Sequence, residues 1–223
     1  MTSPSDAQEI YRLRFGDTQR YRQAVWKVLT AEYFPKYVRP EDVVLDLGCG
    51  YGEFINHIRC AAKYAMDLNP DSKRFLHPEV RLLEQDCAQR WEIPDATLDV
   101  VFTSNFFEHL PAKPELDRTL REAHRCLRPH GRLIAMGPNI KYTGGAYWDF
   151  WDHHVPLTEL SLCEALRTHG FRIDLCHPQF LPYTMVNVKE YPLVFVRAYL
   201  ALPILWRFFG KQFLVMATKN ERS

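Results

Sequence analysis

A glycine-rich turn carries the strongest chemical signal in the chain. Residues 46–52 read Asp-Leu-Gly-Cys-Gly-Tyr-Gly and come directly after an apolar, β-branched run. Gly48, Gly50 and Gly52 allow the backbone to turn tightly and to approach a ligand closely. A helix that begins after such a turn adds N–H donors and positive potential at its N-terminus. The segment therefore predicts a site for a nucleotide-like ligand, and a merely tight strand-to-helix turn is the alternative.

Two further acids stand where the next two strands are expected to end. Asp67 lies at the end of the run 62–68, and Asp86, with Cys87 beside it, follows the run 80–84. An acid at the end of the second strand can accept hydrogen bonds from both ribose hydroxyls. Each acid alone is also a common turn or cap residue. Together with Asp46, however, they place three acids at successive strand ends beside one glycine turn, which favours an adenosyl ligand.

The candidates for proton transfer are His153 and His154, which close the aromatic segment 141–154. A hydroxyl that reacts as a nucleophile needs a proton acceptor within hydrogen-bond reach, and we assign that role to this pair. A hydrogen-bonded, partly buried histidine pair is the alternative. Glu108 and His109 are expected to orient the loop after the fourth strand. No metal site is predicted, because the two adjacent histidines lack the spacing of a helical ligand pair.

The elements that must position these residues alternate between strands and helices. Alternating units predict a parallel sheet with helices on both faces. We expect an α/β fold, a doubly wound, Rossmann-like seven-stranded sheet, mostly parallel with an antiparallel last strand. Strands are expected at 43–47, 62–68, 80–84, 98–104, 131–138, 171–176 and 212–218, and helices at 17–34, 52–59, 116–127 and 158–170.

These elements form one domain in four parts. We expect a helical cover over residues 1–40, a cofactor-binding core over 41–178, a hydrophobic insertion over 179–211 and the last strand over 212–219. The insertion is divided by three prolines and includes a helix over 193–202 that is apolar except for Arg197. Such a helix must be covered. We expect it to act as a lid on the acceptor site. Alternatively, residues 180–210 dock against a membrane surface or a second copy, with Arg197, Arg207 and Lys211 facing head groups or acidic partners.

Composition narrows the class of protein. Of 223 residues, 47% are hydrophobic and 25% are charged, and the formal net charge is +1. These values exclude disordered and coiled-coil classes, and also nucleic-acid binding driven by bulk charge. The six cysteines form no C-x-x-C pair, and residues 1–17 lack the apolar core of a signal peptide. We therefore expect a cytoplasmic protein with reduced thiols, or one at the inner face of a membrane.

In the order and spacing of these motifs, residues 40–220 resemble the class I S-adenosylmethionine-dependent methyltransferases. VLDLGCGYGEF resembles their first motif, YAMDLNP their ribose-binding acid, EQDC their adenine-side loop and LDVVFTSNFFEHL their fourth-strand motif. The resemblance implies S-adenosylmethionine as cofactor and S-adenosylhomocysteine as product. It implies methionyl contacts from the glycine turn, adenosine contacts after the second and third strands, and a methyl-transfer site after the fourth. The residues concerned are Asp46, Gly48, Cys49, Gly50, Gly52, Asp67, Leu68, Asp86, Cys87, Asn105 and Phe106.

Three alternatives accompany this interpretation. A nicotinamide dehydrogenase would want glycine or alanine at Glu53 and has no need of Asp46 or Asp86. A catalytically silent subunit that activates a partner has no need of an intact cofactor site. A metal-dependent RNA-end methyltransferase would want an acid where Asn105 stands. We therefore expect methyl transfer, to oxygen of a small-molecule or lipid-linked glycan acceptor, without nucleic acid and without metal.

Overall fold

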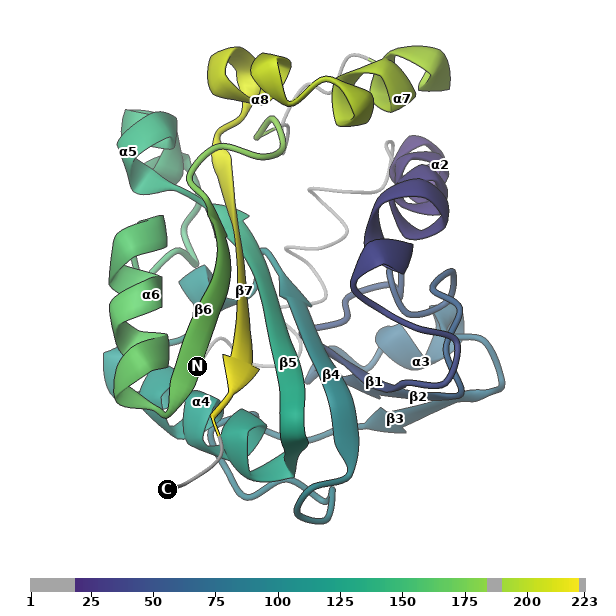
Figure 1. Ribbon diagram of the computed structural model, residues 1–223, viewed down its shortest axis with the longest axis vertical. Helices are drawn as coiled ribbons and strands as arrows, with labels where there is room; N and C mark the ends of the chain where they lie inside the picture. Colours follow the sequence, from purple (N-terminus) through teal and green to yellow (C-terminus); the bar gives the residue numbers. More distant parts are fainter. Residues whose placement is uncertain (1–18, 184–189, 221–223) are drawn as a thin grey trace.

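A computed structural model of the protein describes residues 19–183 and 190–220. Its centre is a seven-stranded sheet in the order β3-β2-β1-β4-β5-β7-β6 (Figure 1). The first five strands pair in parallel, whereas β7 pairs antiparallel with both β5 and β6. The expected fold class is therefore confirmed. The strands are β1 (Val43–Leu47), β2 (Ala62–Met66), β3 (Val80–Leu83), β4 (Leu98–Ser104), β5 (Leu127–Pro138), β6 (Phe171–His177) and β7 (Gln212–Lys219).

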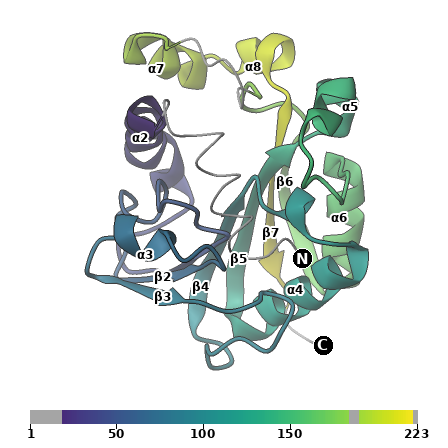
Figure 2. The same cartoon turned by 180° about the vertical axis from the view of Figure 1, so that it is seen from behind.

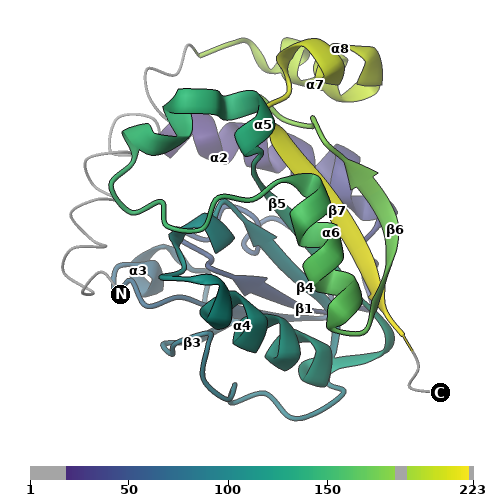
Figure 3. The same ribbon diagram turned by 90° about the vertical axis from the view of Figure 1, so that its left-hand side faces the viewer.

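Helices cover both faces of the sheet because the central strands are apolar on both sides. Successive side chains of a strand point to opposite faces, so Leu45 and Leu47 belong to one buried cluster while Val44 belongs to the other. The first cluster packs beneath α4 (Lys113–Cys126) and α6 (Glu159–Thr168), which lie together on one face in Figure 3. The second cluster packs beneath the helical segment that starts with α2 (Gln19–Val28).

Short elements complete the layers between these helices and the sheet. Helix α6 begins with a capping box in which Thr158 and Ser161 exchange hydrogen bonds, and Gly170 follows it with a φ of 83°. The remaining elements are the π-helical turn Leu29–Tyr33, the 3₁₀ turns Phe34–Lys36, Phe107–His109 and Gly144–Asp149, and the short helices α3 (Ser72–Phe75) and α5 (Ile140–Thr143).

Two helical segments differ from the sequence prediction. The helix expected over 17–34 ends as α2 at Val28, and the chain then continues in the π-helical and 3₁₀ turns before Tyr37. Its first two residues lie outside the described ranges. The helix expected over 52–59 is instead a series of turns, in which Asn56 N–H donates to Gly52 O and Ile58 N–H to Phe54 O. The glycine turn therefore opens into an irregular helical segment.

Two apolar helices lie across the end of the sheet where β5 ends and β7 begins (Figures 1 and 2). They are α7 (Leu193–Ala201), close to its predicted position, and α8 (Pro203–Phe209). Leu200 and Trp206 are buried against the second cluster. Arg197, which faces head groups or a partner in the membrane or second-copy alternative, donates instead to Glu32 at 2.6 Å. In the described ranges, no helix combines the length and the apolar character needed to cross a bilayer.

Candidate functional site

The glycine turn is held in a conformation that other residues rarely adopt. Gly48, Gly50 and Gly52 have φ values of 70°, 53° and 74°. A Cβ at Gly48 would overlap the ring of Phe106, and one at Gly52 would lie 2.7 Å from the Leu76 side chain. Both the backbone angles and the space therefore require glycine.

Asp67 connects the end of β2 to this turn. Its Oδ2 accepts from Gly50 N–H at 2.7 Å, and its Oδ1 accepts from Asn69 N–H at 2.8 Å. Burial raises the pKa of Asp67, while the hydrogen bonds it accepts lower it in part. The neighbouring Leu68 is exposed. Because each carboxylate oxygen can accept more than one hydrogen bond, Asp67 can hold the turn and still accept from a ribose hydroxyl.

Two more carboxylates gather at the turn. Asp46 is buried, and burial together with the nearby Glu53 charge raises its pKa well above the ordinary value. Glu53 forms an ion pair with Arg22 of α2, at 3.0 Å. The N–H groups of Gly48, Cys49, Gly50 and Gly52 donate to protein oxygens, so the polar groups that this turn offers to a ligand are the carboxylates. They fit the ammonium and the cationic sulfur at the methionyl end of S-adenosylmethionine.

Asp86 and Cys87 lie after β3. The Asp86 Oδ1 accepts from Ala88 N–H at 2.9 Å, which closes a local turn. Cys87 is buried, and its carbonyl accepts from the Trp91 indole N–H at 2.8 Å. The structure thus places Asp86 at the predicted strand end but engages its carboxylate in a turn. Its predicted contact to adenine stays a prediction.

A cavity of about 750 Å³ opens beside the glycine turn, a volume typical of small-molecule sites. Asp46, Gly48 and Asn105 belong to its wall at the ends of β1 and β4. Aromatic and aliphatic side chains of α2, of the turn that follows it, and of α7 and α8 form much of the rest. These include Tyr21, Trp26, Leu29, Phe195, Val196, Tyr199, Leu205 and Phe209. Asp67, Leu68, Asp86 and Cys87 lie outside this wall.

His109 is the histidine that reaches this cavity. Its Nδ1 lies 3.0 Å from a carboxylate oxygen of Asp152, and the side chains of both residues are largely buried. We had expected His109 only to orient its loop. The sequence signal that was missed is Asp152, which lies next to the predicted His153 but pairs with a residue from another loop.

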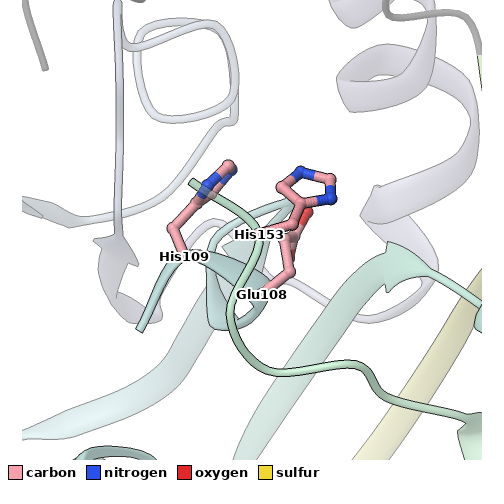
Figure 4. A group of neighbouring side chains, drawn as sticks. All are labelled: Glu108, His109 and His153. Carbon is pink, nitrogen blue, oxygen red and sulfur yellow. The ribbon is translucent and has the colours of Figure 1, made fainter. Parts of the chain in front are cut away.

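The predicted pair His153 and His154 is split. His153 is buried, and its Nδ1 lies 2.8 Å from the carbonyl oxygen of Tyr147. The side chain of His154 is exposed, while its backbone N–H donates to the carbonyl of Glu108. Neither histidine belongs to the cavity wall, so their assignment as general base stays a prediction. Figure 4 shows that His153 instead gathers with Glu108 and His109.

Comparisons with known proteins agree with this geometry. Residues 45–135 match the family model described as a methyltransferase domain. Over 137 residues, the chain is 29% identical to a probable S-adenosylmethionine-dependent methyltransferase of Mycolicibacterium smegmatis, an alignment that covers 59% of this chain and 52% of that protein. The chain thus spans about half the length of this curated relative.

Two solved structures share the fold over nearly the whole chain. An S-adenosylmethionine-dependent methyltransferase from Archaeoglobus fulgidus has a TM-score of 0.67 at 22% identity, covering 92% of this chain and 99% of its own. The second structure is a chain from the complex between the Haloferax volcanii Trm112 methyltransferase activator and a methyltransferase. Its TM-score is 0.68 at 16% identity, and the alignment covers 95% of this chain and 97% of that chain. The match over residues 45–135 and the shared fold support the class I S-adenosylmethionine-dependent methyltransferase superfamily, and S-adenosylmethionine is the cofactor that the glycine turn fits.

Proposed function

We propose that the protein transfers the methyl group of S-adenosylmethionine to an oxygen atom of an apolar small-molecule or lipid-linked acceptor. The observation that carries this proposal is the cavity, whose wall runs from Gly48 and Asn105 to the apolar side chains of α7 and α8. A cofactor held at the turn and an acceptor held under these helices share one enclosed space. An in-line displacement needs such an arrangement.

The cofactor supplies the chemistry, since its sulfonium group activates the methyl carbon and leaves as a neutral thioether. The chain's own residues then position and desolvate the reactants. The carboxylates of Asp46 and Glu53 and the backbone of the glycine turn hold the cofactor at the cavity wall. The rings of Trp26, Phe195 and Phe209 exclude water from the acceptor. This role corresponds to the lid that the sequence predicts for residues 179–211.

Oxygen is the favoured acceptor atom because an ionisable polar cluster adjoins the cavity. His109 belongs to the wall, Asp152 holds its Nδ1, and Glu108 and His153 lie behind it. A hydroxyl held at His109 can lose its proton there as its oxygen bonds the methyl carbon. The remaining wall under α7 and α8 is apolar, which suits an acceptor with a hydrocarbon portion.

The test has two stages. Calorimetry on the purified chain should detect binding of S-adenosylmethionine and S-adenosylhomocysteine but no binding of NAD. Incubation with isotope-labelled cofactor and fractionated membrane and soluble extracts should then label an ether or ester in an organic-phase product. Tight NAD binding would reinstate the dehydrogenase alternative.

The same two stages distinguish methyl transfer by this chain alone from the second alternative, a subunit that activates a partner. A chain that binds the cofactor but labels nothing until a partner protein is added would be the non-catalytic or partner-dependent subunit. This arm of the test is needed because a chain with this fold comes from a solved complex with a methyltransferase activator.

A further inference from the structure

Glu108, His109 and His153 form a compact cluster built from two separate loops. Glu108 and His109 belong to the 3₁₀ turn after β4, and His153 belongs to the segment that precedes α6. One side-chain ligand atom from each residue lies within 4.8 Å of the other two (Figure 4). Glu108 is 3% exposed and His153 is 4% exposed. The cluster is therefore set into the protein and is not a chance group of surface charges.

The hydrogen bonds at the two rings fix which nitrogen of each faces the cluster. His153 Nδ1 lies 2.8 Å from the Tyr147 carbonyl. His109 Nδ1 lies 3.1 Å from the backbone carbonyl of Asp152 and 3.0 Å from its carboxylate. A carbonyl and a carboxylate can only accept, so each Nδ1 carries the hydrogen. In the neutral rings, each Nε2 then carries a lone pair. Metal-ligating histidines are oriented in the same way, by a carbonyl or carboxylate on the second nitrogen.

We propose that Glu108, His109 and His153 bind a divalent transition-metal cation at the wall of the acceptor cavity. Two imidazole nitrogens and one carboxylate oxygen form a donor set that suits Zn²⁺, Fe²⁺, Co²⁺ or Mn²⁺. Three protein ligands leave a coordination position open, as in catalytic sites. Because His109 belongs to the cavity wall, the site adjoins the space proposed for the acceptor.

The cluster needs only a small adjustment to bind the ion. Ligand atoms in a tetrahedral site with bonds of about 2.0–2.1 Å lie roughly 3.3 Å apart. Closing from separations of up to 4.8 Å requires shifts on the order of an ångström, within the reach of side-chain rotations. Sequence patterns did not predict the site, because its ligands come from two loops and position 105 is an asparagine.

With a cation here, the metal takes over the role that the proposed function gives to the His109 imidazole, and this part of the inference rests on that function. Metal coordination lowers the pKa of a bound hydroxyl, so the acceptor oxygen would ionise on the metal and release its proton to water. The oxygen lone pair then bonds the methyl carbon, and the broken carbon–sulfur pair stays on sulfur. Neither imidazole has to take the proton.

Cobalt binding tests the site without any activity assay. The full chain, treated with chelator and dialysed, is titrated with Co²⁺ and followed by visible absorption, and bound metal is counted by mass spectrometry. We expect one equivalent, displaced by Zn²⁺. His109→Ala and Glu108→Gln should abolish the spectrum. Asp152→Asn should weaken binding by about 10-fold, because it removes the carboxylate charge at His109 Nδ1 but keeps the backbone carbonyl.

His154→Ala is the matched control, since His154 is adjacent in sequence and exposed. It should bind cobalt like the wild type. Thermal melting checks that each variant folds, and His109, at the cavity wall, gives a variant that leaves the buried His153 intact. The proposal would be overturned by a wild-type chain that binds no cobalt, or by unchanged cobalt affinity in folded His109→Ala. Calorimetry with S-adenosylmethionine on the same samples shows whether the cofactor site survives, so the two proposals can fail separately.

Discussion

At the scale of single residues, the glycine turn acts through backbone conformation and through the space that it leaves. Gly48 adopts a φ of 70°, and a side chain there would overlap Phe106. We predict that Gly48→Ala costs about 1–2 kcal/mol of stability from the backbone alone and abolishes measurable cofactor affinity. Gly145→Ala is the control, because a Cβ at Gly145 meets nothing within 4 Å. Denaturation and calorimetry measure both effects. Equal behaviour of the two variants would contradict the argument.

Asp67 has two tasks, and one substitution series separates them. Asp67→Ala removes the acceptor for Gly50 N–H and the charged acceptor for the ribose, so cofactor affinity should fall by about 1.5–3 kcal/mol. Asp67→Asn keeps one oxygen for Gly50 N–H, and its cofactor affinity should lie between those of the wild type and Asp67→Ala. Calorimetry measures the affinities, and a denaturation curve reports any loosening of the turn. Unchanged affinity in Asp67→Ala would remove the ribose assignment.

The sequence predicted the glycine turn as a unit, but it gave Glu108, His109 and His153 separate roles and did not predict that they form one cluster. The reason is physical. Gly48, Gly50 and Gly52 act within one local turn, so their spacing alone indicates the conformation. His109 and Asp152 meet only because the loop after β4 and the segment before α6 come together at one end of the sheet. Such a contact is set by tertiary packing, which leaves no short-range pattern.

At the scale of elements, helix α6 shows how local signals fix a boundary. Thr158 caps the helix, and its Oγ1 accepts from Ser161 N–H at 3.1 Å. Thr158→Ala should therefore lower the free energy of unfolding by about 1 kcal/mol. Thr168→Ala is the control, because Thr168 is exposed at the other end of the helix. Chemical denaturation compares them. Equal stabilities for the two variants would show that the cap contributes nothing.

Segments whose hydrophobic pattern fits one secondary structure were predicted well. Segments whose local pattern conflicts with tertiary packing were not. Strand β4 runs over the predicted residues 98–104, because its apolar side chains are buried between both layers. The segment after the glycine turn forms only turns. Residues Cys49, Phe54, Ile55 and Ile58 pack into the core there, and tertiary packing overrides the helical pattern.

At the scale of the whole molecule, α7 and α8 carry apolar side chains on two sides. Phe195 and Phe209 belong to the cavity wall but are 61% and 59% exposed, and Ile204 and Phe208, outside the wall, are 55% and 74% exposed. Arg207 and Lys211 are exposed on the same stretch. Apolar rings flanked by cations suit an anionic lipid surface, where each cation contributes about 1 kcal/mol.

We predict that the chain floats with anionic vesicles at low salt and that Phe208→Asp abolishes flotation. Leu160→Asp is the control, because Leu160 is 61% exposed on α6, away from these helices. Light scattering of the free chain reports whether a second copy covers the surface instead. A monomer that never floats would leave only the role of these helices as a lid.

The position of β7 has a consequence for how the chain folds. The strand lies between β5 and β6 and pairs along Arg132–Pro138 on one side and Phe171–His177 on the other. It comes last of the described strands, so β5 and β6 each carry an open edge until it arrives. Pairing of segments so distant in sequence is slow, because loop-closure entropy is lost before contacts form. During synthesis, the nascent chain therefore exposes two edges that invite aggregation, and chaperone binding should be strongest just before residue 212 emerges.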